Sequence, residues 1–201
     1  MSTQDNLIIW QSKESCKLDF TDRVSVENNA KDLIARGVVL CSICRNAFAY
    51  HGSYQRGLKD RDSSKEQGWV AQLRCDICKE YPALIPDFIM PYKHYKAEVI
   101  EAVITEYENG HNIEHTGGCA ADISTMRRWV KQFKERGAQA VGWLLSVLLS
   151  LYNRRISLLK LQNMTLLRQL ARLLYEFRLP KTGGIIGRVN IILTTQNCGF
   201  L

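Results

Sequence analysis

Along the first 91 residues of this 201-residue chain, apolar positions come in short runs or alternate with polar ones. Such runs predict strands, and they occupy residues 7–10, 38–40, 46–54 and 70–74. Between the last two runs, residues 57–68 are polar and bracketed by glycines, which predicts the loop of a hairpin. One weakly amphipathic stretch, residues 24–36, predicts a poor helix that ends at Gly37.

From residue 92 onward, apolar residues recur three and four positions apart, which is the spacing of amphipathic helices. The predicted helices are 95–107, 125–136, 143–152 and 158–179. We expect Ser124 to cap the second of these helices and Gly137 to end it. The apolar run at 143–152 is shorter than the roughly 20 residues of a membrane span, so it predicts a buried helix. The closing residues 190–195 predict a strand.

Two Cys-x-x-Cys pairs, Cys41 with Cys44 and Cys75 with Cys78, are the strongest chemical signal in the sequence. Each pair follows an apolar run, and a tight turn at the end of a strand can present two thiolates to one tetrahedral ion. Because two such turns close a four-sulfur site, the sequence predicts a zinc ribbon with one structural Zn²⁺. His51 could also be a ligand, but four thiolates are sufficient.

Two other uses of these cysteines agree less well with the sequence. A disulfide framework needs an oxidising compartment, whereas the chain begins without the basic and apolar segments of a secretory leader. We therefore expect a cytoplasmic protein with no membrane partner. A thioredoxin-like redox site would need one Cys-x-x-Cys pair at the start of a helix, not two distant pairs. The spacer of residues 45–74 is longer than in the commonest two-pair zinc sites, and the polar hairpin loop accounts for the excess.

Positive charge is concentrated in the second half of the chain. From residue 119 onward there are 13 Lys and Arg against 3 Asp and Glu, a net charge of +10. Before residue 119 there are 14 against 17, a net charge of −3. Because a basic surface attracts polyanions, this asymmetry indicates a nucleic-acid partner. The alternative is that basic helices solubilise the protein or meet an acidic protein.

The predicted helix at 125–136 has the two faces of a DNA-recognition helix. Its apolar residues lie on one face, and they are Met126, Trp129, Val130 and Phe133. Five of its remaining residues would project toward a DNA groove, and they are Thr125, Arg127, Arg128, Lys131 and Lys134. An ordinary surface helix with a basic outer face has the same pattern. The preceding helix and the cysteine pairs favour DNA recognition.

Several segments between residues 41 and 136 carry a resemblance to a known architecture. They are the cysteine pairs and residues 51–56, 73–78, 82–91, 91–95 and 124–129. Together they resemble the N-terminal DNA-binding part of insertion-sequence transposases, in particular an uncharacterised bacterial family of transposon-like proteins that joins a zinc ribbon to a helix-turn-helix. The resemblance implies double-stranded DNA as a partner, and a homo-oligomer or a transposase subunit as further partners. One difference is that residues 111–121 contain two glycines and two histidines, so the middle helix of the three-helix unit is expected to be short or irregular.

The sequence therefore predicts an α+β protein made of three parts. Residues 1–91 hold the N-terminal segment and the zinc ribbon. Residues 92–137 form a helix-turn-helix domain. Residues 138–201 form a C-terminal helical hairpin with a short tail.

A transposase-like reaction would need clustered carboxylates that hold two metal ions. Past Arg136 the only acidic residue is Glu176, and all four histidines lie before residue 116. We therefore expect a DNA-binding protein without its own catalytic domain, not an enzyme. Two alternatives stay open: a zinc-stabilised protein-interaction module, and a non-autonomous fragment of a transposase.

Overall fold

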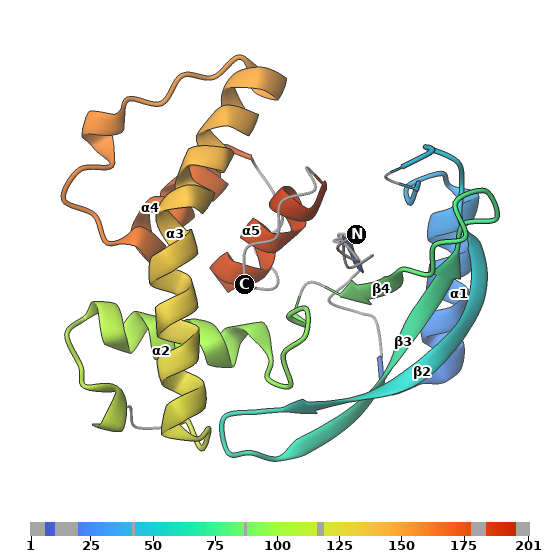
Figure 1. Ribbon diagram of the computed structural model, residues 1–201, viewed down its shortest axis with the longest axis horizontal. Coiled ribbons are helices and arrows are strands. Elements are labelled where there is room, and N and C mark those ends of the chain that lie inside the picture. Colours follow the sequence, from blue (N-terminus) through green and yellow to red (C-terminus); the bar gives the residue numbers. More distant parts are fainter. Residues whose placement is uncertain are drawn as a thin grey trace.

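The computed structural model describes residues 7–10, 20–41, 43–86, 88–115, 119–177 and 184–195. In this part of the chain four strands form one sheet, and five α-helices pack on the sheet or beside it (Figure 1). The α+β class of fold agrees with the prediction. No described helix is both long enough and apolar enough to cross a membrane.

The sheet has the strand order β1-β4-β3-β2. Its strands are β1 (Leu7–Trp10), β2 (Ala49–Lys59), β3 (Lys65–Arg74) and β4 (Ala83–Pro86). β2 and β3 form a long antiparallel hairpin, β4 pairs antiparallel with β3, and β1 lies parallel to β4. Helix α1 (Arg23–Ala35) packs on β2 and β3, with Val26, Ala30 and Leu33 buried.

The hairpin is longer than the sequence pattern indicates. Its strands continue to Lys59 and resume at Lys65, so Gly57 and Gly68 lie within the strands and not in the loop. Gly68 has a packing reason for being glycine, because an added Cβ would lie 1.8 Å from the ring of Phe20. A glycine inside a strand can mark such a close approach as readily as a turn.

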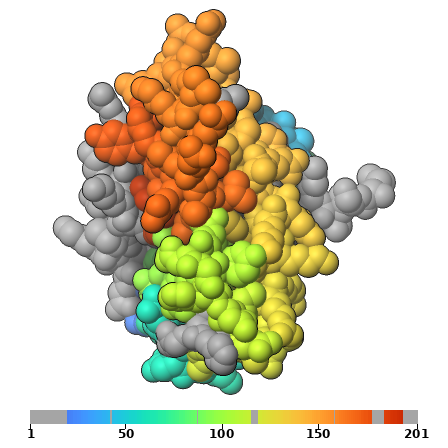
Figure 2. Space-filling view, turned by 90° about the vertical axis from the view of Figure 1, so that its left-hand side faces the viewer, coloured from blue at the N-terminus to red at the C-terminus, as the bar shows by residue number. Residues whose placement is uncertain are grey.

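The helical half of the molecule has its own apolar core. Its elements are α2 (Ala97–Glu108), the 3-10 turn η2 (Ile113–His115), α3 (Ile123–Tyr152), the 3-10 turn η3 (Leu158–Lys160), α4 (Leu166–Glu176) and α5 (Gly184–Thr195). α2, α4 and α5 all pack against α3, the long helix of Figure 1. Figure 2 shows α2 in green beside the first half of α3 in yellow, with the hairpin in cyan below them.

α3 corrects two predictions about helix ends. It runs without interruption from Ile123 to Tyr152, so Gly137 does not end a helix. Gly137 is buried, and an added Cβ would lie 3.0 Å from Leu166 at the start of α4. The packing of α4 on α3 thus offsets the roughly 1 kcal/mol that glycine costs a helix relative to alanine. The N-cap is Asp122 and not Ser124, because the Asp122 carboxylate accepts from the N–H of Ser124 at 2.8 Å.

The predicted helix at 158–179 is shorter in the structure. Its first residues form η3, and the α-helix begins only after Thr165, whose side chain caps α4. Its end at residue 179 lies outside the described residues.

The predicted strand at 190–195 is wrong, because these residues belong to helix α5. α5 lies between the two halves of the molecule (Figure 1). Its Ile191 joins the core of the sheet, whereas Ile186, Val189 and Leu193 join the core of the helices. A helix buried on several sides shows no amphipathic period, so its run of β-branched residues resembles a strand.

Candidate metal centre and nucleic-acid interface

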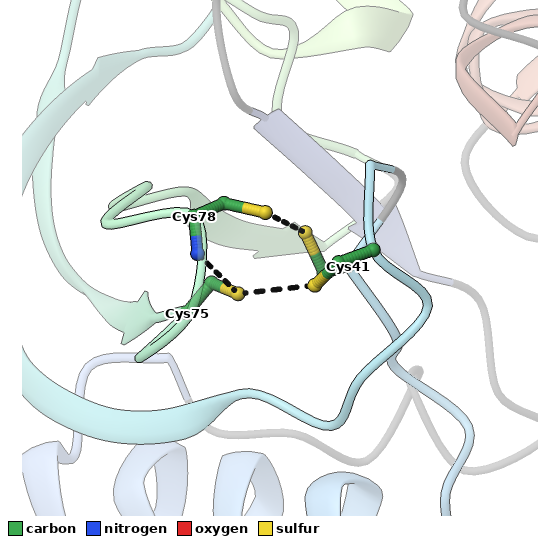
Figure 3. Close-up of side chains that lie close together, drawn as sticks. Cys41, Cys75 and Cys78 are labelled. Carbon is green, nitrogen blue, oxygen red and sulfur yellow. Dashed lines mark hydrogen bonds between the residues drawn. The ribbon is translucent and has the colours of Figure 1, made fainter.

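Two turns from different parts of the chain bring Cys41, Cys44, Cys75 and Cys78 together. The first turn lies between α1 and β2, and the second lies between β3 and β4. The four sulfurs all lie within 4.8 Å of one another, with 3.9 Å between Cys41 and Cys78 and 3.5 Å between Cys44 and Cys75 (Figure 3). Within the described part of the chain, no other group of three or more His, Cys, Asp or Glu could hold an ion.

The two turns share one backbone geometry. In each, the N–H of the first cysteine, Cys41 or Cys75, donates to the carbonyl five residues later. The N–H four residues later donates back to the carbonyl of that cysteine, and all four of these bonds measure 2.9 Å. The donor is Arg45 in the first turn and Lys79 in the second, with φ of 60° and 58°. The repeated Cys-x-x-Cys sequence is therefore also a repeated structure.

The sulfur distances fit a tetrahedral ion better than a disulfide. A disulfide would need sulfurs about 2.05 Å apart, whereas bonds of about 2.3 Å to one tetrahedral ion place sulfurs about 3.8 Å apart. Cys41 and Cys75 are buried, and Cys44 and Cys78 are half-buried. Four protein ligands fill a tetrahedral shell and leave no open position, which is typical of a structural metal site.

Two of the four thiols, Cys44 and Cys78, have shifted pKa values. Hydrogen bonding from Asn46 lowers the pKa of Cys44 to about 6. The hydrogen bond with Cys44, followed by burial and the other two thiols, raises the pKa of Cys78 to about 12. A divalent cation between the sulfurs would favour the thiolate form of every ligand. The donor set therefore fits a thiolate-binding ion.

His51 does not belong to the cysteine group. It lies on β2, and its ring contacts the ring of Tyr81 edge-to-face, with the centroids 5.0 Å apart. The four-thiolate set predicted from the sequence is thus the set that the fold brings together.

The first half of α3 buries the face that the sequence predicts to be buried. Its four apolar residues, Met126, Trp129, Val130 and Phe133, are buried. Trp129 packs edge-to-face on Tyr95, with the ring centroids 5.0 Å apart. The four predicted DNA-contacting cations are exposed, and Thr125 is half-buried; the cations are Arg127, Arg128, Lys131 and Lys134.

Two of these cations are engaged by the elements before α3. Arg127 forms an ion pair with Glu114 of η2. Lys134 lies over the ring of Tyr107 of α2, 4.5 Å from its centroid. Both lie on the flank of α3 that faces α2 and η2.

Arg128 lies on the other side of the exposed face, in a group of cations. Lys93, from the segment before α2, donates from Nζ to Oε1 of Gln132 at 2.5 Å. Burial, followed by the charges of Arg128 and Arg136, lowers the pKa of Lys93. We call Lys93, Arg128 and Arg136 the cation cluster. Because these charges repel one another, an anion beside them would be bound favourably.

The tip of the β2–β3 hairpin holds the start of α3. The N–H of Ala120 donates to the carbonyl of Arg61 at 2.7 Å, and Ser63 Oγ donates to the carbonyl of Ala120 at 3.1 Å. Lys96, just before α2, forms ion pairs of 2.8 and 3.0 Å with two carboxylates of the hairpin. The base of the same hairpin carries the cysteine group, since Cys75 directly follows β3. One element therefore connects the cysteines with the basic helix.

Sequence reasoning missed Lys93, Gln132 and Arg136 as members of the basic surface. Gln132 and Arg136 follow Arg128 at four and eight positions, so helical spacing could have placed them on one stripe. Lys93 lies outside the helix, and only the fold brings it beside Arg128. Between α2 and α3 the described residues contain η2 and no second α-helix.

A family model described as a domain of unknown function (DUF6431) matches residues 41–129. The match begins at Cys41 of the cysteine group and ends at Trp129 of α3, so it contains all four cysteines and the start of the basic helix. No curated protein and no solved structure matches the chain.

Proposed function

We propose that this protein is stabilised by zinc and binds double-stranded DNA. In this proposal the first half of α3 enters the major groove. The proposal extends to α2, η2 and α3 acting as a helix-turn-helix like that of the transposases that the sequence resembles, with the short η2 in place of their middle helix. No catalytic role is part of it. The metal centre is structural, and the basic face of α3 makes the contact.

Zinc is the ion that best suits the cysteine group. Tetrahedral four-sulfur sites hold Zn²⁺ or iron, and soft thiolates select against hard ions such as Mg²⁺ and Ca²⁺. Two ligands come from the turn after α1 and two from the turn after β3. The ion would therefore hold the base of the hairpin together.

The cation cluster is the observation that supports the DNA partner most strongly. Lys93 donates to Gln132, which lies between Arg128 and Arg136 on one stripe of α3, and Arg128 is exposed there. Burial, followed by the charges of Arg128 and Arg136, lowers the pKa of Lys93. Adjacent positive charges attract a polyanion, and phosphate contacts supply most of the affinity of many DNA-binding proteins.

The predicted contacts have different roles in this proposal. Arg128 points outward near the start of α3, where base edges are usually read, and an Arg that is bidentate to guanine contributes about 1–3 kcal/mol of discrimination. Thr125 and Arg127 lie at the flanks of the same end. Lys131 and Lys134 contact phosphates. Lys131 Nζ lies 3.8 Å from Oε1 of Glu135 and would exchange this carboxylate for a phosphate.

The test is a salt series of duplex-DNA affinity for the parent protein, Arg128→Ala and Lys131→Ala. Lys131→Ala removes a phosphate contact and should make the slope of log affinity against log salt less steep by about 0.9. Arg128→Ala removes a base contact and should mainly relax sequence specificity. Arg36→Ala is the matched control, because Arg36 is also an exposed arginine, directly after α1, and has its own partner, Asp32. If both α3 variants stay folded and bind like the parent at every salt concentration, this helix does not contact DNA.

One observation favours a second candidate, the protein-interaction module. Ile43 and Ile77 occupy the third position of the two cysteine turns, and each is 65% exposed. Exposed isoleucines at equivalent positions would suit an apolar partner. If the parent protein shows no salt-dependent binding to duplex DNA, the protein-interaction module becomes the leading proposal.

A further inference from the structure

An exposed tyrosine in an unfavourable backbone conformation lies next to the cation cluster. Tyr92 has φ of 56° and is 63% exposed. The left-handed region is unfavourable for a residue with a Cβ, so the surrounding structure has to hold it there. Strained backbone of this kind is concentrated at functional sites.

Arg56 of β2 holds the backbone on both sides of Tyr92. One nitrogen of its guanidinium donates to the carbonyl of Met90 at 2.9 Å and to the carbonyl of Lys93 at 2.8 Å. Burial lowers the pKa of Arg56, and the phenols of Tyr54 and Tyr92 oppose this effect. Tyr54 precedes Arg56 by two positions on β2 and so lies on the same face of the strand. Both tyrosines therefore lie near one guanidinium, which holds the backbone around Tyr92.

Aromatic and cationic groups meet at this corner. Tyr54 on β2 is a second accessible ring, 40% exposed. Lys93 adjoins Tyr92 in the chain, and its hydrogen bond to Gln132 places it against α3. Proteins bind single-stranded nucleic acid with this combination, because cations follow the phosphates while rings stack on unpaired bases.

We propose that Tyr92 and Tyr54 form a stacking platform for unpaired bases, so that the preferred partner is duplex DNA that continues into a single strand. This inference rests on the proposed function and extends it from duplex DNA to a junction. α3 contacts the duplex, Lys93 contacts the backbone at the junction, and the two rings take the first unpaired bases.

The experiment compares the affinity of the full chain for a blunt duplex and for the same duplex extended by a short single-stranded tail. The parent protein should bind the tailed DNA about 5- to 150-fold more tightly, which corresponds to the stacking of one base. Tyr92→Phe keeps the ring and should keep this gain. Tyr92→Gly removes the ring and also relieves the positive φ, so it should fold, bind the blunt duplex like the parent and lose most of the gain.

Tyr175→Ala is the matched control, because Tyr175 on α4 is an exposed tyrosine away from this corner. It should keep the gain from the tail. Equal affinity of the parent for the two DNAs, or a gain that survives in Tyr92→Gly, would overturn the junction proposal and leave duplex binding standing. Binding to the tailed DNA without binding to the blunt duplex would overturn the duplex proposal and, because the junction proposal rests on it, the junction proposal as well. Binding to neither DNA would overturn both.

Discussion

Two glycines show how the neighbours of a single residue decide the effect of one methyl group on stability. Gly142 is exposed in the middle of α3, and an added Cβ would have no atom within 4 Å. Gly68 on β3 lies against Phe20, where an added Cβ would overlap the ring. The first glycine carries only the entropic disadvantage of glycine in a helix. The second makes room for a side chain of the sheet core.

Gly142→Ala should raise the free energy of unfolding by about 0.5–1 kcal/mol, since alanine is the better helix former. Gly68→Ala should lower it by about 1–3 kcal/mol, because Phe20 has to leave its position. Urea denaturation of the two variants and the parent measures both. A stabilising Gly68→Ala would mean that Phe20 does not pack on β3 as described.

Helix α2 is an element whose carboxylates cap two other helices. Glu101 accepts from the N–H groups of Ile185 and Ile186 at the start of α5, at 2.6 and 3.1 Å. Glu108, on the same side of α2 two turns later, accepts from the N–H of Leu167 at the start of α4 at 3.1 Å. Carboxylates at helix starts satisfy donors that have no partner within the helix. The start of α5 is thus fixed by a residue more than 80 positions earlier in the chain.

Burial raises the pKa of Glu101 in spite of its two backbone hydrogen bonds. A raised pKa in the folded state means that the contribution of Glu101 to stability is complete below the unfolded pKa near 4.5 and declines as the pH rises through the folded pKa. Glu101→Gln keeps an acceptor oxygen without the charge. The parent should therefore lose stability relative to this variant as the pH rises from the unfolded pKa through the folded pKa. Glu101→Ala should cost about 1–3 kcal/mol at any pH through the unpaired N–H groups.

Denaturation of the parent and both variants between pH 4 and pH 8 tests this account. A parent that gains stability relative to Glu101→Gln as the pH rises would show that hydrogen bonding and the helix dipole outweigh the burial of the charge.

Elements with a local signal could be predicted from the sequence, and elements defined by distant contacts could not. The cysteine turns, the strand Leu7–Trp10 and the rotation of α3 around Trp129 follow from spacing alone. The length of α3 depends on Leu166 packing on Gly137, and helix α5 depends on Glu101 and on burial between two cores. The cation cluster was missed for the same reason, because Lys93 meets α3 only in the folded chain.

At the scale of the whole molecule, the β2–β3 hairpin joins the proposed metal centre to the proposed DNA surface. The cysteines lie where the hairpin begins and ends, and its tip is bonded to Ala120 and Lys96 at the starts of α3 and α2. Arg56 on β2 holds the corner that carries Lys93. Loss of the metal should therefore displace the hairpin and, through it, the cation cluster.

The most direct test of this account is the affinity for duplex DNA of the metal-loaded protein and of the same protein stripped with a chelator. Elemental analysis should show one zinc per chain before stripping and none after. The account predicts that stripping weakens binding about tenfold or more, because about 10 kcal/mol of metal-binding energy no longer holds the hairpin, and that added Zn²⁺ restores it. Cys75→Ser should behave like the stripped protein. Unchanged affinity after complete removal of the metal would contradict the link between the cysteine centre and the DNA surface.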